Sequence, residues 1–123
     1  MEEVCMGSNW GKHVICDLYG CDLSTMTNAQ HIKDFVKELV KQIDMIAFGE
    51  TVVVHFGDNE KVEGFTMSQM IQTSMISAHF ANHTKAIYLD VFSCKDFSSK
   101  TVVDLAGKWF KATSHIVHVI ERK

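Results

Sequence analysis

Residues 72–80, QTSMISAHF, combine an apolar stretch with side chains that can do nucleophilic or acid–base chemistry. A hydroxyl stands at Ser74 and an imidazole at His79, and the thiol of Cys94 follows fifteen residues after His79. A regular strand places Ser74 and His79 on opposite faces, because their offset is odd. The two side chains therefore meet only if the chain bends or breaks between them. Otherwise all three are ordinary polar or small residues, hydrogen-bonded or packed in a core.

Histidine and cysteine also raise the question of a metal site, since the chain has seven histidines and four cysteines. His79 and His83 are four apart, and His115 and His118 are three apart. Only the first pair has the even offset that shares one face of a strand. No C-x-x-C pair occurs, so the common zinc and thioredoxin spacings are absent. With no third or fourth ligand evident, we expect no metal.

The elements that must position these residues follow the order strand, helix, several strands, helix, strand. Apolar residues at helical spacing run from Ile32 to Ile43, with Thr27 or Asn28 as the expected N-cap. A second helix begins near Ser98 or Ser99 and carries apolar residues as far as Phe110. β-Branched content and alternation predict strands over residues 12–20, 51–56, 65–74, 86–93 and 115–121. The segment CDLSTMTN, residues 21–28, is predicted to be a loop.

This order predicts one α+β domain spanning residues 1–123, a two-layer sandwich with a largely antiparallel sheet and two helices on one face. Net charge of −3 argues against nucleic-acid binding. No run of 18 apolar residues is present, so we expect no membrane span. The N-terminal MEEVCMGSNWGK lacks the apolar region of a secretory signal, and we expect a cytoplasmic protein.

Three segments together resemble a known family. They are GKHVICDLYGCD, GFTMSQMIQTSMISAHF and YLDVFSCKDF. The most specific feature is the spacing of a serine, a histidine five residues later and a cysteine twenty residues after the serine, which Ser74, His79 and Cys94 satisfy. The chain in these respects resembles the short prokaryotic form of S-adenosylmethionine decarboxylase, a pyruvoyl-dependent enzyme of polyamine biosynthesis. The similarity extends over most of the chain.

The resemblance implies that the chain cleaves itself between Thr73 and Ser74, into residues 1–73 (the beta chain) and 74–123 (the alpha chain). It implies that Ser74 becomes a pyruvoyl group, which forms a Schiff base with the substrate amine and serves as the electron sink for decarboxylation. Neither pyridoxal phosphate nor a metal is then needed. His79 would be the base of self-cleavage, and Cys94 would return a proton to the product. Thr66 occupies the position of a family hydroxyl that assists processing.

The resemblance also implies a homodimer of cleaved protomers, with active sites near the interface, that acts on a small-molecule substrate. Several positions depart from the family pattern. Thr73 replaces a glutamate, Met75 replaces a histidine, and the connector GDNEKVEG is longer. His83 stands where the family has a glutamate that grips the substrate's ribose hydroxyls, so substrate binding is assigned to His83. A carboxylate accepts two hydrogen bonds from a diol, which a histidine cannot do in the same way.

Two alternatives follow from these departures. The same pyruvoyl chemistry can act on L-arginine or L-ornithine, whose cationic side chains require acidic partners. The acidic candidates are Asp17, Asp58, Glu60 and Glu63. The other alternative is a relative that is not processed and regulates a partner by forming a hetero-oligomer.

Overall fold

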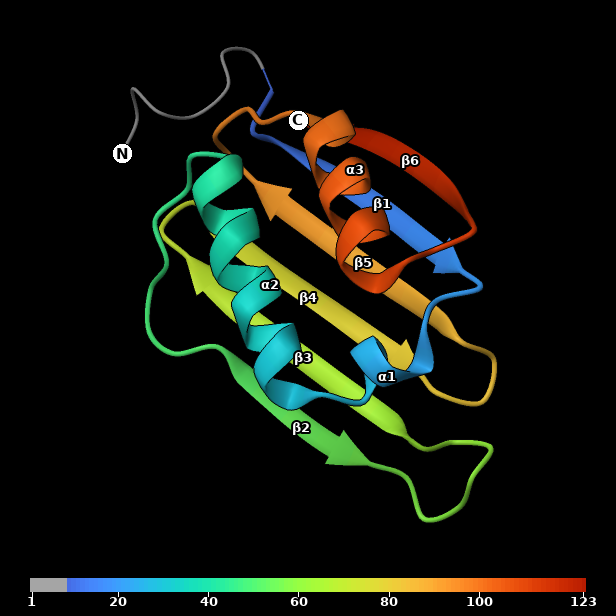
Figure 1. The fold of residues 1–123 in the computed structure, drawn as a ribbon. Coiled ribbons are helices and arrows are strands. Elements are labelled where there is room, and N and C mark those ends of the chain that lie inside the picture. Colours follow the sequence, from blue (N-terminus) through green and yellow to red (C-terminus); the bar gives the residue numbers. More distant parts are fainter. Residues whose placement is uncertain (1–8) are drawn as a thin grey trace.

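The computed structural model describes residues 9–123, which form a six-stranded sheet with helices on one face (Figure 1). The strand order is β2-β3-β4-β5-β1-β6, and every neighbouring pair is antiparallel. The strands are β1 (Gly11–Tyr19), β2 (Val52–Phe56), β3 (Gly64–Ile71), β4 (Ser74–Ala81), β5 (Ala86–Ser93) and β6 (Ser114–Arg122). The helices are α1 (Leu23–Met26), α2 (Ala29–Gln42) and α3 (Ser99–Phe110). The predicted α+β sandwich is confirmed, with the short α1 as an addition to the two expected helices.

The helices begin where local side chains can satisfy their first backbone N–H groups. Asn28 caps α2 by accepting a hydrogen bond from the N–H of His31. Ser98 caps α3 in the same way. Residues 21–28 were predicted to be a loop, but Asp22 accepts a hydrogen bond from the N–H of Ser24 and starts the single turn of α1. Short polar residues favour such caps because their oxygens replace the missing intrahelical acceptors.

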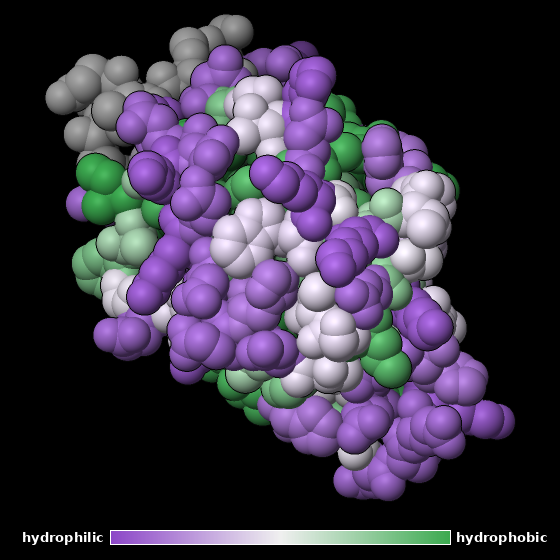
Figure 2. All heavy atoms as spheres, viewed as in Figure 1, coloured by the Kyte–Doolittle hydropathy of each residue, from purple (hydrophilic) through white to green (hydrophobic). Residues whose placement is uncertain are grey.

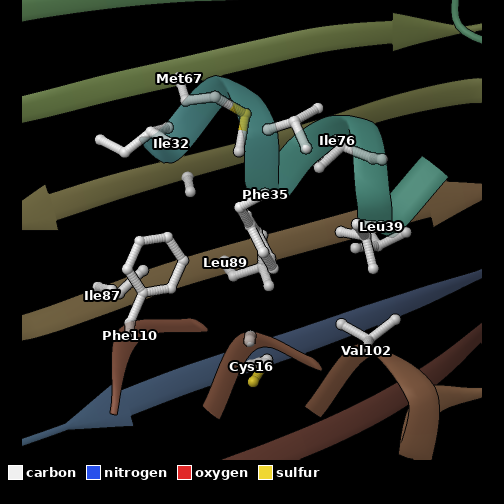
Figure 3. Packing of buried hydrophobic residues seen from close by; sticks show 14 of the residues in the cluster. Cys16, Ile32, Phe35, Leu39, Met67, Ile76, Ile87, Leu89, Val102 and Phe110 are labelled. Carbon is white, nitrogen blue, oxygen red and sulfur yellow. The ribbon is translucent and has the colours of Figure 1, made fainter. Parts of the chain in front are cut away.

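One face of the sheet packs on α2 and α3 and forms the core of the protein. Figure 3 shows Phe35 of α2 and Phe110 of α3 meeting over the sheet, and their ring centroids lie 5.0 Å apart in an edge-to-face arrangement. Alternate residues of the strands, including Ile76 and Leu89, are buried beneath them. The burial follows from the two-residue period of a strand, which sends every second side chain toward the helices.

The opposite face of the sheet, which we call the open face, is covered by no helix of the described residues. Large apolar side chains are nevertheless exposed on its strands. They are Val52, Val54, Met70, Met75, Tyr88, Ile116 and Ile120. The helix side, by contrast, presents mainly hydrophilic residues to solvent (Figure 2). Large exposed apolar side chains on one face of a sheet are a feature of surfaces that bind other proteins.

Within residues 9–123, no helix combines the length and the apolar character needed to cross a membrane.

Candidate active site

The Thr73–Ser74 bond lies at a tight turn between two neighbouring strands. Ile71 and Ser74 are paired in the β3–β4 register, so Gln72 and Thr73 alone connect the strands. The sequence predicted a strand continuing to Ser74, whereas the structure ends β3 at Ile71 and begins β4 at Ser74. The bond predicted to be cut therefore joins a turn residue to the first residue of a strand.

Thr73 is held by contacts on its carbonyl and on its hydroxyl. Its carbonyl oxygen accepts a hydrogen bond of 3.0 Å from the backbone N–H of Cys94. Ser93 Oγ donates to Thr73 Oγ1 at 2.6 Å, and Thr73 Oγ1 donates to Met45 Sδ at 3.4 Å. An N–H aimed at a carbonyl oxygen stabilises the negative charge that develops when a nucleophile adds to that carbonyl. The contacts thus fix and polarise the carbonyl that precedes Ser74.

Ser74 and His79 do not meet within one chain. They lie on the regular strand β4, which neither bends nor breaks between them. Their odd offset places them on opposite faces, and five residues of strand separate them by roughly 16 Å. The helix-facing side chains of β4 are those of Ile76, Ala78 and Phe80, so His79 is on the open face. The bend that would bring Ser74 and His79 together is absent from the structure.

On the open face, His79 lies in a row of side chains that crosses the sheet. The strand registers pair Thr66 with His79, His79 with Tyr88, and Tyr88 with Asp17. Thr66 Oγ1 lies 3.3 Å from His79 Nδ1. The Phe56 ring lies 4.8 Å from the His79 ring, centroid to centroid. The structure thus groups three residues identified from the sequence with two that were missed, Tyr88 and Phe56.

A second missed group lies beside this row on β1 and β5. His13 Nε2 is 2.9 Å from Asp90 Oδ1. The Phe92 ring stacks on Trp10 with centroids 5.4 Å apart. His13, Asp90 and Phe92 share strand parity with Asp17 and Tyr88, and this alternation is the sequence signal that could have identified them.

Cys94 follows β5 directly and is buried next to the turn that contains Thr73. It is disulfide-bonded in the structure, so the proton donation predicted for it requires reduction to the thiol. Cys16 and Cys21 are free and buried. Burial raises the pKa of each of these two thiols to about 11, which keeps them protonated and unreactive at neutral pH.

His83 lies in the turn that follows β4, at the end of the strand opposite to Ser74. It lines a cavity of about 310 Å³ together with Glu60, Glu63 and Asn82. The strand between Ser74 and this turn spans roughly 25 Å. His83 is therefore remote from the Ser74 of its own chain. No three histidine, cysteine or acidic side chains among residues 9–123 are grouped so that they could hold a metal ion.

The comparisons with known proteins agree with one another. The model of the family described as S-adenosylmethionine decarboxylase matches residues 12–123. The S-adenosylmethionine decarboxylase proenzyme of Clostridium botulinum (strain Langeland) is 28% identical over 94 residues, which cover 76% of this chain and 77% of that protein. The proenzyme of Archaeoglobus fulgidus is 26% identical over 113 residues, covering 91% of this chain and 96% of that protein.

The fold is also that of a solved relative. The crystal structure of the adenosylmethionine decarboxylase from Aquifex aeolicus VF5 superposes with a TM-score of 0.79 at 23% sequence identity, covering 94% of this chain and 92% of that chain. Because the family model spans nearly the whole chain, this protein belongs to the S-adenosylmethionine decarboxylase family.

Proposed function

We propose that this chain is a proenzyme that cleaves itself between Thr73 and Ser74 and then decarboxylates S-adenosylmethionine in polyamine biosynthesis. The observation that carries the proposal is the carbonyl of Thr73, held by the Cys94 N–H at a tight turn immediately before Ser74. Family membership supplies the reaction class. We propose that the enzyme acts in the cytoplasm and that its substrate is a small molecule.

The proposed cleavage begins when Ser74 Oγ attacks the carbonyl carbon of Thr73. The oxygen of that carbonyl takes on negative charge, which the Cys94 N–H stabilises. Collapse breaks the Thr73–Ser74 C–N bond and leaves an ester on Ser74 Oγ with a free amine. A base then removes the Ser74 Cα proton, the Cβ–Oγ bond breaks, and Thr73 leaves as a carboxylate. Water hydrolyses the resulting dehydroalanine, releasing ammonia and leaving a pyruvoyl group.

The pyruvoyl carbonyl supplies the electron sink that decarboxylation of an amino acid requires. Ser74 fits its part as precursor, because it begins a strand whose preceding carbonyl is already polarised. Cys94 is the residue after Ser93, which pairs with Ser74 in the β4–β5 register, and we assign to its reduced side chain the return of a proton near residue 74. This scheme requires no pyridoxal phosphate.

We further propose that the base comes from a second copy of the chain. His79 is separated from its own Ser74 by roughly 16 Å of regular strand and faces the other way. The open face that carries His79 exposes large apolar side chains, and packing two such faces in a symmetric homodimer would bury them. In that dimer, Thr66 and His79 of the partner subunit would serve the Ser74 of the first chain, whose side chain, at the start of β4, would have to turn from the helix-covered face to the open face.

Substrate contacts would likewise come from both chains. Asp17 and Tyr88 lie in the open-face row beside His79, where an amino acid bound between two sheets would meet them. We assign His83 to substrate binding as well, in the partner's half of the site, since it is distant from its own Ser74.

One observation favours the second substrate class. Glu60 and Glu63 line the same cavity as His83, and carboxylates suit the cationic side chain of arginine or ornithine better than a ribose. Lys85 also lines this cavity, and Glu63 lies 3.1 Å from His55 Nε2, so Glu60 is the carboxylate left for a bound cation. Release of carbon dioxide from S-adenosylmethionine, L-arginine and L-ornithine, assayed side by side, separates the two. Release from S-adenosylmethionine alone supports our assignment, and release from arginine or ornithine alone contradicts it.

Mixed dimers test cleavage and its base together. Ser74→Ala is expected to stay intact and inactive, and His79→Ala to be cleaved slowly or not at all. When the two variants are co-expressed, the His79→Ala chain keeps Ser74 and can receive the partner's His79. Cleavage of that chain alone is the expected result. If neither chain is cut, although wild type is, then His79 acts within its own chain.

A further inference from the structure

Ser93 and Cys94, at the end of β5, contact Thr73, and the next residue, Lys95, lines a cavity with it. Ser93 Oγ donates to the Thr73 hydroxyl, and the Cys94 N–H donates to the Thr73 carbonyl. Lys95 then lines, together with Thr73, a small cavity of about 50 Å³. The first two contacts are neutral hydrogen bonds, whereas Lys95 brings a positive charge, paired with Asp44, to the cavity that Thr73 lines.

The ammonium group of Lys95 is paired with Asp44, and another carboxylate could replace Asp44 in this pair. Its Nζ lies 2.9 Å from Asp44 Oδ2 and donates to the Asp44 carbonyl oxygen at 2.6 Å. The Asp44 side chain lines the same cavity but is 93% exposed, while the Lys95 side chain is 31% exposed. An ion pair with so exposed a carboxylate contributes little, because water screens it. A less hydrated carboxylate in the same cavity would therefore compete for Lys95.

Such a carboxylate is created by the proposed self-cleavage, on which this inference rests. When the Ser74 Cβ–Oγ bond breaks, its electron pair leaves with Oγ, and Thr73 becomes a carboxylate. Thr73 is only 8% exposed. A buried carboxylate without a cation is unfavourable, and the preceding ester carries no such charge. The requirement for a cation thus arises in the elimination and not in the formation of the ester.

We propose that Lys95 is the counter-ion of the leaving Thr73 carboxylate. As the ester breaks, the ammonium of Lys95 exchanges the Asp44 carboxylate for that of Thr73 and accelerates the elimination. Afterwards, the same pair anchors the new C-terminus of chain 1–73 beside the Cys94 N–H. Lys95 acts on the processing reaction and takes no part in the decarboxylation.

The test compares Lys95→Met with Lys95→Arg and Asp44→Asn in freshly synthesised full-length chain, followed by intact mass over time. We expect Lys95→Met to cleave about tenfold more slowly or worse, in line with the loss of one preorganised donor at a developing charge. Samples quenched with hydroxylamine, which splits esters, should show more ester in Lys95→Met than in wild type. Lys95→Arg keeps the charge and should restore most of the rate.

Asp44→Asn distinguishes this role from a merely structural one. If Lys95 serves the Thr73 carboxylate, removing the Asp44 charge, which leaves Lys95 only its hydrogen bond to the Asp44 carbonyl, keeps cleavage at the wild-type rate or faster. If Lys95 only anchors the turn at Asp44, Asp44→Asn and Lys95→Met slow cleavage equally and no ester accumulates, which overturns the proposal. Lys100→Met, which breaks the exposed pair with Asp104 on α3, is the matched control and should change nothing.

Two further results are decisive. A wild-type rate in Lys95→Met overturns the role of Lys95 and leaves self-cleavage standing. A wild-type chain that stays intact overturns self-cleavage itself and this role with it. Lys95→Gln serves as a second neutral variant, so that failure of Lys95→Met to fold does not decide the matter.

Discussion

The two faces of the sheet are made by the same six strands but have different roles. The helix-covered face buries Leu39, Phe110 and their neighbours completely and contains few polar groups. The open face exposes Met70 and Tyr88 and carries the hydroxyl and imidazole of Thr66 and His79. The first face accounts for the stability of a protomer. The second carries both exposed apolar residues and reactive side chains, and it is the surface that we propose is completed by another copy of the chain.

The largest effect is expected from a change on the open face. A charge on the open face should dissociate the proposed dimer and, with it, abolish cleavage, because the partner's His79 is lost. We choose Met70→Lys, since Met70 is 51% exposed and its loss costs the protomer little. Sedimentation gives the oligomeric state, and a denaturing gel gives the extent of cleavage.

Val62→Lys is the matched control for that substitution. Val62 is 53% exposed but belongs to the connector between β2 and β3 and not to the sheet. It should remain dimeric and cleaved. A monomeric Met70→Lys protein that still cuts itself would show that the open face does not supply the base.

On the helix-covered face, the expected effect is on stability. Leu39→Ala should lower the free energy of unfolding by about 2–5 kcal/mol, because it leaves a cavity in a fully buried site. Denaturant titration measures the change. Leu23→Ala, at a leucine that is 41% exposed, should cost about 0.5 kcal/mol or less. Equal losses at the two leucines would contradict the assignment of the core.

The reactivity of the thiols provides a second test of burial on the helix-covered face. Burial raises the pKa of Cys16 and Cys21 to about 11. At pH 8 their thiolate fraction, and so their rate of alkylation, should be about a hundredfold below that of an exposed cysteine. Iodoacetamide labelling followed by peptide mass spectrometry checks this, with urea-unfolded protein as the control. Rapid labelling of Cys16 in the folded chain would place it outside the core.

The smallest effect concerns an exposed ion pair. The hydrogen bond from Lys12 lowers the pKa of Asp96. A carboxyl group whose pKa is lower in the folded state stabilises the protein at pH values above its unfolded pKa. This stabilisation is lost as the pH falls through the folded pKa. Since Asp96 is largely exposed, Asp96→Asn should reduce the stability lost between about pH 6 and pH 3 by at most about 0.5 kcal/mol. Denaturant unfolding curves at the two pH values measure the loss of stability in each protein. A larger loss in Asp96→Asn than in wild type would contradict the prediction.

Much of the fold was predictable because its signals are local. Helical spacing located α2 and α3, and alternation and β-branched content located every strand except β4, which was not among the predicted strands. Two boundaries were missed for physical reasons. The turn at Gln72 and Thr73 contains none of the glycine, proline or asparagine residues that mark turns, so the strand was extended to Ser74. The turn of α1 depends on one side-chain cap, that of Asp22.

The site was predictable only as a set of residues. Spacing identified Ser74, His79 and Cys94, but strand register decides that Tyr88 is beside His79, and register is a non-local property. The contact between Lys95 and Asp44 joins residues 51 positions apart and has no sequence signature. The separation of Ser74 from His79 on one regular strand is what directs attention to a second copy of the chain.

The central claim is that the chain cuts itself before Ser74, and the intact mass of the purified protein tests it most directly. The account predicts two chains, residues 1–73 ending in a free carboxylate and residues 74–123 beginning with a pyruvoyl group, and a single uncut chain for Ser74→Ala. A wild-type protein that retains the mass of all 123 residues after prolonged incubation under reducing conditions would contradict it.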